Sequence, residues 1–299
     1  MSVTDSGAAA APGRRKPGTA HSGGGAGHGV ASVRAVLWPA EAIWEAVVPD
    51  LPGFTVEILP TIDSTNTELM RRARAGRLEP VLLVAEHQTA GRGRLGRDWL
   101  SDAGAGANKT RNGSLTFSLG LPLSPLDWSG LSLAVGVSVA QSLHPDLRLK
   151  WPNDVWLQDR KLGGILIETA SLGDIRYAVV GVGINIDQRH AAGLATPPAW
   201  LREVFADIDA PQALLRIAAP LVQAIRAFEA RGFAPFQTRF NERDALGGLT
   251  VALSDGTTGV AQGVDGVGAL RVHTAQGLKK ITSSEVSLRP LSPPPYENL

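Results

Sequence analysis

The chain has 299 residues, of which 43% are apolar and 19% are charged, and its formal net charge at pH 7 is +1. This balance gives no sign of bulk binding to nucleic acid or to a membrane. The absence of cysteine excludes disulfides, thiolate metal sites and cysteine nucleophiles. No apolar run reaches the roughly 18 residues that span a bilayer, and no secretory signal is visible. We therefore expect a cytoplasmic protein.

The first 35 residues are rich in glycine and alanine and contain the cations Arg14, Arg15 and Lys16. Such a segment cannot bury enough apolar surface to offset the entropy of ordering it, so 1–35 is predicted to be a disordered arm. Three adjacent cations are weak evidence for nucleic-acid binding. Because the arm also lacks the periodic apolar positions of a helix-turn-helix, no DNA binding is expected.

The segment 36–247 has the pattern of one large domain. Helical spacing predicts helices over 38–48, 63–76, 131–143, 214–228 and 236–246. Short apolar runs predict strands over 54–59, 81–85, 114–119, 147–151, 155–157, 165–168 and 177–182. The last four are joined by turns too short for parallel neighbours. The fold class is therefore α+β, a mixed and largely antiparallel sheet with helices packed on one side.

From residue 248 the pattern changes to short strands separated by hairpin turns such as Ser254-Asp255-Gly256. Strands are expected at 249–254, 258–262, 269–273, 278–281 and 286–288. The segment 248–290 is thus predicted to be a small β-barrel, followed by a proline-rich tail over 291–299.

One loop, Gly91–Trp99, places three arginines among glycines. Glycine allows close approach of the backbone to a ligand, and arginine pairs with phosphate or carboxylate, so the loop is suited to enclosing an anion. It also matches the dinucleotide pattern G-x-G-x-x-G. The match fails in context, because 100–106 is not helical and 111–118 holds no carboxylate for a ribose. A solvated basic turn is the remaining alternative.

Two polar clusters flank this loop. Ser64-Thr65-Asn66 is either a plain helix cap or a row of hydrogen-bonding groups for a polar heterocycle. Glu86-His87-Gln88-Thr89 ends a buried strand just before the loop, where a sheet presents ligand groups. His87 is not expected to bind a metal, because no second histidine lies at a suitable spacing.

Two further clusters follow the predicted helix 131–143. Lys150-Trp151-Pro152-Asn153-Asp154 is a tight turn whose carboxylate could hold Mg²⁺ on a nucleotide. Lys161-Leu162-Gly163-Gly164-Ile165-Leu166-Ile167-Glu168 places a lysine at the start of a buried strand, next to glycines that permit close approach. A surface lysine at a hairpin is the alternative.

In this order and spacing the clusters resemble the biotin–protein ligase family, the biotin–[acetyl-CoA-carboxylase] ligases. The resemblance runs from about Asp63 to Ile186, through the motifs above and Gly-Val-Gly-Ile-Asn-Ile, and more weakly through the C-terminal barrel. It implies a catalytic domain of the class II aminoacyl-tRNA synthetase type and an SH3-like barrel. Since 1–35 cannot form a DNA-binding domain, a non-regulatory member is expected.

The resemblance implies a reaction in two steps. Biotin and Mg-ATP give biotinyl-5′-AMP and pyrophosphate, and a lysine of a biotin carboxyl carrier domain of a biotin-dependent carboxylase then attacks the mixed anhydride. Mg²⁺ is the implied cofactor, with ATP and biotin as substrates. Membrane contact is not expected, and homodimer formation is left open.

The resemblance also implies roles for single residues. The biotin side holds Ser64, Thr65, Asn66 and Gln88 at the ureido ring, with Arg92, Gly93, Arg94 and Lys161 around biotin and the phosphate. The catalytic set is Lys161, Arg94 and Arg92. The ATP and adenylate side holds Arg94, Arg97, Trp99, Asn153 and Asn185, and Asp154 is the candidate for Mg²⁺.

Two alternatives stay open. A lipoate–protein ligase shares the fold and the chemistry, but lipoate lacks a ureido group, so the polar set at Ser64–Asn66 and Gln88 favours biotin. A non-catalytic regulator that binds biotin would not need Lys161 and Asp154. The stretch 101–112 is longer than the usual link in this family, and its effect on the loop is left open.

Overall fold

The computed structural model describes residues 36–100, 113–189, 197–253, 255–282 and 289–290. The predicted arm over 1–35, the stretch 101–112, the strand at 286–288 and the tail over 291–299 lie outside the described residues. Within the described ranges, no helix has the length and apolarity needed to cross a membrane.

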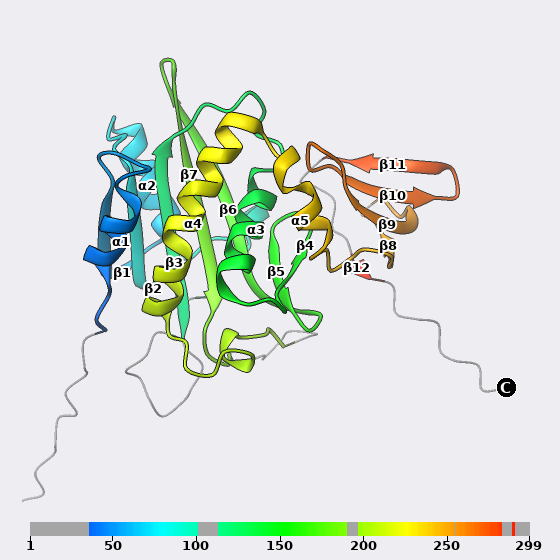
Figure 1. The fold of residues 1–299 in the computed structure, drawn as a ribbon, viewed down its shortest axis with the longest axis horizontal. Coiled ribbons are helices and arrows are strands. Elements are labelled where there is room, and N and C mark those ends of the chain that lie inside the picture. The colour runs from blue at the N-terminus through cyan, green and yellow to red at the C-terminus, as the bar shows by residue number, and fades with distance from the viewer. Residues whose placement is uncertain (1–35, 101–112, 190–196, 254, 283–288, 291–299) are drawn as a thin grey trace, which may run out of the picture. The chain divides into compact units, whose positions relative to one another are not determined.

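The larger sheet has seven strands in the order β1-β2-β3-β7-β6-β5-β4 (Figure 1). Its strands are β1 (Thr55–Ile62), β2 (Val81–Gln88), β3 (Ser114–Pro122), β4 (Arg148–Lys150), β5 (Asp154–Leu157), β6 (Arg160–Leu172) and β7 (Ile175–Asn185). Among the strands that the structure describes in this sheet, only β1 and β2 are parallel to each other, and all other neighbouring pairs are antiparallel. The predicted mixed, largely antiparallel sheet is confirmed.

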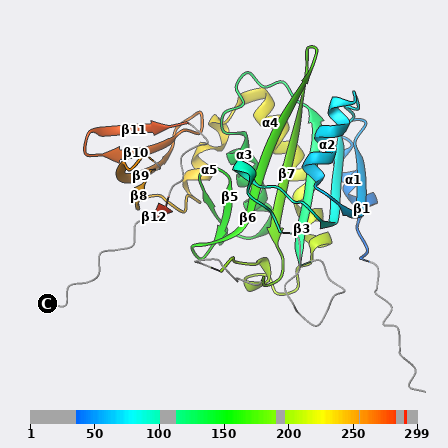
Figure 2. The same cartoon turned by 180° about the vertical axis from the view of Figure 1, so that it is seen from behind.

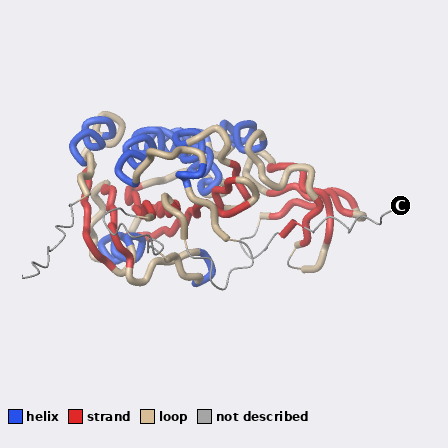
Figure 3. The backbone as a smooth tube through the Cα atoms, turned by 90° about the horizontal axis from the view of Figure 1, so that it is seen from below, coloured by secondary structure: helices blue, strands red, loops and turns tan. Residues whose placement is uncertain are grey.

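Helices cover both faces of this sheet (Figures 2 and 3). The helices α1 (Ala40–Val47), α3 (Leu131–Leu143) and α4 (Ala210–Arg231) contribute to the first core cluster, whereas α2 (Thr65–Arg74) belongs to a second cluster. Alternate residues of β2 divide between the two clusters: Leu82 and Val84 join the first, and Val81 and Leu83 pack with α2. We expected all helices on one side, and this is wrong for α2. An apolar run without alternation buries both faces of its strand.

The last helix of the large domain is much shorter than predicted. After a 3₁₀ turn at Ala234–Phe236, α5 covers only Gln237–Asn241. The chain then runs beside β4, where the Leu149 N–H donates to Arg243 O at 2.8 Å and the Ala245 N–H donates to Leu149 O at 2.9 Å. The second half of the predicted helix therefore extends the edge of the sheet instead.

The second sheet has five antiparallel strands in the order β11-β10-β9-β8-β12. They are β8 (Thr250–Ala252), β9 (Thr258–Val264), β10 (Leu270–Thr274), β11 (Gly277–Ile281) and β12 (Arg289–Pro290). Alternate residues such as Val251, Ala261 and Val272 are buried, which is the pattern of a sheet with one covered face. The predicted small antiparallel β unit is confirmed.

In the segment of the chain between α5 and β8, Asp244 has an unusual environment. Its Oδ1 accepts the Leu246 N–H at 2.9 Å, while its buried Oδ2 has no hydrogen-bond partner among the described residues. Burial raises the pKa of this carboxyl group from 3.8 to about 6, against the opposing effect of that one hydrogen bond. Ionisation of Asp244 near neutral pH therefore opposes folding.

We predict that Asp244→Asn stabilises the protein in a pH-dependent way. Because the folded-state pKa lies above the unfolded one, the contribution of Asp244 to stability is largest below about pH 4 and is lost as the pH rises through about 6. Urea unfolding at pH 4 and pH 7 should show a gain for the variant that grows with pH, by up to about 3 kcal/mol. An equal gain in the free energy of unfolding at pH 4 and pH 7 would contradict this account.

Asp255→Asn supplies a control of opposite sign. Its carboxylate pairs with Lys279 at 2.6 Å, and the hydrogen bond from that lysine lowers its pKa to about 2. The contribution of this carboxylate to stability is present above the unfolded pKa and is lost as the pH falls. Relative to wild type, the variant should therefore lose more stability at pH 7 than at low pH.

Candidate active site

A cavity of about 220 Å³ lies on the α2 side of the larger sheet, where the end of β2, the start of α2 and the Gly91–Trp99 loop meet β6 and β7. Twelve of the thirteen predicted site residues line it: Ser64, Thr65, Asn66, Gln88, Arg92, Gly93, Arg94, Arg97, Trp99, Asn153, Asp154 and Lys161. Asn185 is not part of the lining. Segments about 100 residues apart in the chain thus converge on one hollow.

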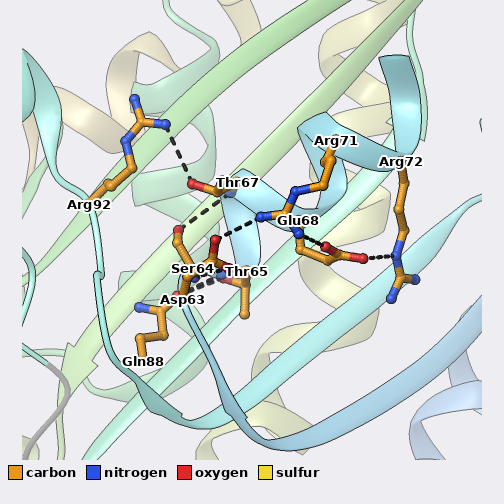
Figure 4. Close-up of polar contacts among 9 residues, drawn as sticks. All are labelled: Asp63, Ser64, Thr65, Thr67, Glu68, Arg71, Arg72, Gln88 and Arg92. Atoms are coloured by element: carbon orange, nitrogen blue, oxygen red, sulfur yellow. Dashed lines mark hydrogen bonds and ion pairs between the residues drawn. The ribbon is translucent and has the colours of Figure 1, made fainter. Parts of the chain in front are cut away.

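The start of α2 supplies the neutral polar end of the cavity (Figure 4). Ser64 is the N-cap, and its hydroxyl accepts the Thr67 N–H at 3.4 Å. Thr65 donates its backbone N–H to Gln88 Oε1 at 2.8 Å, and its hydroxyl oxygen lies 3.1 Å from the same atom. Ser64 therefore does cap the helix. The cluster also has a second role, because the next residue, Thr65, connects the helix to the end of β2 by a hydrogen bond.

Ser118 on β3 was missed by the sequence reasoning. Its fully buried hydroxyl lies 2.6 Å from Thr65 Oγ1 and 2.6 Å from Asn66 Oδ1. A serine hydroxyl carries one proton and can accept others, so Ser118 joins these two residues into one network. Its signal in the sequence was the alternation of Thr116 and Ser118 with apolar residues, which puts two buried polar groups on the cavity face of the strand.

Asn66 is held by the protein on all sides. Its Nδ2 donates to Leu166 O at 3.3 Å and to Glu168 Oε2 at 3.0 Å, while its Oδ1 accepts from Ser118. Opposite it lies Gly181 on β7, where an added Cβ would overlap Asn66 Oδ1. The residue is 4% exposed, and its amide is fixed by these hydrogen bonds, as buried amides require.

The Gly91–Trp99 loop closes as a short hairpin. Arg92 and Asp98 form an antiparallel bridge, and the Trp99 N–H donates to Gly91 O at 2.9 Å. Its tip is a 3₁₀ turn at Arg94–Gly96 in which Leu95 has a left-handed φ of 56°. No α-helix opens at these glycines, so the loop lacks the helix N-terminus with which a dinucleotide fold binds pyrophosphate.

The loop cations contact polar groups of other elements. Arg92 lies 3.5 Å from Thr67 Oγ1 and 3.5 Å from Glu168 Oε1. Arg94 donates to Asn153 Oδ1 at 3.0 Å. Burial lowers the pKa of Arg94, with Asp154 acting in the opposite sense, yet a guanidinium stays charged at neutral pH.

Lys161, at the start of β6, faces the turn before β5. Its Nζ lies 2.7 Å from Asp154 Oδ1, and the cavity-facing Gly164 adjoins both side chains. Asn153 fixes the same turn, because its Nδ2 donates to Ile165 O at 2.8 Å and the Ile165 N–H donates to Asn153 O at 2.9 Å. The turn is therefore rigidly attached to the strand that carries the lysine.

Trp99 is one of three aromatic residues that line the cavity, together with Phe117 and Trp151. An added Cβ at Gly183 would overlap the Trp99 indole, and the Arg189 guanidinium lies 5.1 Å from the ring centroid. Asn185 follows Gly183 by two positions on β7 and is 2% exposed. Its Nδ2 donates to Ala199 O at 2.9 Å, while its Oδ1 has no hydrogen-bond partner among the described residues.

The donor set bears on how a metal could bind. The described residues contain no group of three or more His, Cys, Asp or Glu side chains arranged to hold a metal ion. Mg²⁺ is commonly held by one or two carboxylates together with substrate phosphates. Asp154, one of the two carboxylates in the cavity lining together with Asp98, fits an ion that arrives with a nucleotide.

The arrangement joins two chemistries in one cavity. One end offers neutral hydrogen-bonding groups around α2 and Ser118, and the other offers fixed cations from the loop and β6. Fixed cations offset the repulsion between two reacting anions and stabilise charge that develops between them. The cavity can therefore hold a polar heterocycle and bring an attached anion to a phosphate.

Comparison with known proteins agrees with this geometry. Residues 58–185 match the Biotin/lipoate A/B protein ligase family, and residues 249–289 match the Biotin protein ligase C terminal domain. The chain is 36% identical over 254 residues to the bifunctional ligase/repressor BirA of Escherichia coli, covering 81% of this chain and 77% of the relative. It is 31% identical over 243 residues to a biotin–[acetyl-CoA-carboxylase] ligase of Paracoccus denitrificans, covering 77% and 98%.

A solved structure is also similar. The biotin protein ligase from Aquifex aeolicus in complex with biotin and ATP superimposes with a TM-score of 0.65 at 31% identity, covering 79% of this chain and 99% of that one. The chain belongs to the biotin protein ligase family and is an enzyme of that family.

Proposed function

We propose that this protein activates biotin as biotinyl-5′-AMP and transfers the biotinyl group to a lysine of a biotin carboxyl carrier domain. The observation that carries the proposal is the single cavity in which a neutral polar end adjoins a cationic end beneath the arginine loop. The similarity to a ligase solved with biotin and ATP supports the same substrates.

The neutral end is assigned to the ureido ring. The Ser64 hydroxyl accepts the Thr67 N–H and keeps a proton that it can donate to the ureido oxygen. Thr65 and Gln88 lie next to it, and Asn66 is held in the same network through Ser118. A site built to hydrogen-bond a polar ring discriminates against an analogue that lacks those groups, because its own buried polar atoms would be left unpaired.

The cationic end is assigned to adenylate formation. A carboxylate oxygen of biotin attacks the α-phosphorus of ATP, the bond from that phosphorus to the bridging oxygen breaks, and pyrophosphate leaves. Lys161 and Arg94 would stabilise the charge that develops there, as fixed cations do in phosphoryl transfer. Asp154 would contact Mg²⁺ brought by ATP, and the ion would neutralise phosphate charge.

The nucleotide side is assigned to Trp99, Arg97, Asn153 and Asn185. A buried acceptor without a partner carries a desolvation cost that a ligand N–H would relieve. The Oδ1 atom of Asn185 is such an acceptor, and it lies on the same strand face as the cavity-lining Gly183. This supports a contact between Asn185 and the adenine of the bound nucleotide.

Transfer completes the reaction. The carrier lysine amine attacks the carbonyl carbon of the mixed anhydride, AMP leaves with the bonding electrons, and the amine loses a proton. Until then water must be kept from the anhydride. The hairpin loop, which carries Arg92 and Arg94 over the cavity, is assigned this role.

Lys161→Ala should abolish adenylate synthesis. Loss of a cation from the phosphate site removes stabilisation made chiefly in the transition state, so biotin-dependent pyrophosphate release should fall about 100-fold or more. Lys279→Ala is the matched control, because that lysine pairs with Asp255 on the second sheet. Near-normal pyrophosphate release by the Lys161 variant would contradict the assignment of Lys161 to adenylate formation.

Arg94→Gly should slow adenylate synthesis less than Lys161→Ala does, because Lys161 remains, but it should fail to retain the adenylate that it makes. The variant loses the contact between the loop and Asn153 at 3.0 Å, so free biotinyl-5′-AMP should accumulate in the filtrate without carrier. Arg77→Gly, which alters an exposed arginine in the loop after α2, is the control. No free adenylate above the wild-type level would count against the retaining role of Arg94.

Substrate choice can be tested by comparing biotin with lipoate in pyrophosphate release and carrier labelling. Wild-type enzyme should use biotin, and Ser118→Ala should raise the KM for biotin about tenfold by removing contacts that organise Thr65 and Asn66. Ser138→Ala is the matched control, since this buried serine hydroxyl has no hydrogen-bond partner among the described residues. Equal use of lipoate would favour the lipoate ligase alternative.

A further inference from the structure

One face of β6 runs from the cavity toward α2. Gly164 and Leu166 line the cavity, and Glu168 is the next residue on that face, since alternate residues of a strand share a side. Glu168 closes the motif that begins at Lys161, yet the adenylation chemistry proposed above gives it no role.

The two oxygens of Glu168 contact two different parts of the site. Oε2 accepts from Asn66 Nδ2 at 3.0 Å, and Oε1 lies 3.5 Å from Arg92 Nη2. The Glu168 side chain is 23% exposed and that of Arg92 is 49% exposed, so the ion pair is partly shielded from water. One carboxylate thus joins the amide at the neutral end of the cavity to the first arginine of the loop.

We propose that Glu168 is a positioning residue that couples the polar network of the biotin pocket to the arginine loop. The proposal rests on the proposed function, because it assigns Glu168 to retention of the adenylate made there.

The contacts of Asn66 make this coupling direct. Both hydrogens of its amide point to β6, one to Leu166 O and the other to Glu168, so the carboxylate is fixed from the side of the pocket. Arg92 has a second, neutral anchor on α2 at Thr67 Oγ1, 3.5 Å away. A shift of α2 relative to β6 therefore changes both contacts of Arg92 together.

Two substitutions separate the contacts of Glu168. Glu168→Gln keeps a carbonyl oxygen for Asn66 but removes the charge that faces Arg92, and Glu168→Ala removes both contacts. Glu57→Gln is the matched control, because Glu57 pairs with Arg72 at 2.8 Å at the other end of α2. Thermal melting of each variant checks that the fold is intact.

The first measurement is steady-state adenylate synthesis together with release of free biotinyl-5′-AMP in the absence of carrier. Glu168→Gln should release the adenylate about five- to tenfold faster, with kcat and the KM for biotin within about twofold of wild type. Glu168→Ala should in addition raise that KM about tenfold. If Glu168 had only a structural role, activity would fall in parallel with the melting temperature. The adenylate release rate and the KM for biotin would then not change separately.

A double-mutant cycle with Arg92→Gln tests the coupling itself. If Glu168 acts through Arg92, adding Glu168→Gln to Arg92→Gln should leave the release rate unchanged within about twofold. Independent, multiplying effects would overturn the proposal, as would a Glu168→Gln variant that retains adenylate like wild type.

Limited trypsin digestion without any ligand gives a readout that does not depend on the reaction. Cleavage after Arg92, Arg94 and Arg97 should be faster in both Glu168 variants than in wild type and in Glu57→Gln. Equal cleavage in all four proteins would overturn the proposal. Failure of the proposed function has a different signature, since wild-type enzyme itself would then form no adenylate from biotin and Mg-ATP.

Discussion

The constraint on which the site depends is that several cations must be kept around a cavity that has to accept anions. Like charges repel, and a buried cation is costly without a partner. The structure meets this with a different partner for each of three cations: Glu168 for Arg92, Asn153 for Arg94 and Asp154 for Lys161. Asn153 and Asp154 are adjacent at the start of β5, and Glu168 projects from β6. The charge balance of the cavity is therefore set by β5, β6 and the turn before them, whereas the arginines come from a loop after β2.

A similar constraint, this time on buried polar groups, accounts for the position of α2 on the opposite face of the sheet from the other helices. A helix there brings Thr65 and Asn66 against Gln88 of β2, Ser118 of β3 and Glu168 of β6. Buried polar groups are stable only when their hydrogen bonds are made, and this network connects several strands and one helix. Gly181 makes the approach possible, because a side chain at this point of β7 would overlap Asn66.

The sequence was sufficient for most elements, since each rests on local periodicity that the chain displays. It failed where distant pairing decides the outcome. The run Val81-Leu82-Leu83-Val84 is apolar at every position, so it marks a buried strand without saying that helices cover both sides. Residues 243–245 continue a helical pattern but pair with Leu149, almost a hundred residues earlier. Periodicity within a window cannot register such a partner.

The site divides in the same way. The twelve predicted site residues between Ser64 and Lys161 could be selected from local chemistry, and all of them line one cavity. Ser118 and Glu168 were not selected, because the role of each depends on its contact with Asn66, which is distant in sequence.

A loop that admits a substrate and then encloses an intermediate needs contacts that can be exchanged. Partly exposed ion pairs and hydrogen bonds at 3.0–3.5 Å, such as those of Arg92 and Arg94, are modest in free energy. A phosphate entering the cavity offers charge-assisted hydrogen bonds to the same guanidinium groups, and such bonds are stronger than those to an amide or hydroxyl oxygen. The buried network around Asn66 has no comparable reason to rearrange, since its donors already have partners within the protein. The cavity thus combines a fixed polar end with an adjustable cationic end, and Glu168 lies where the two meet.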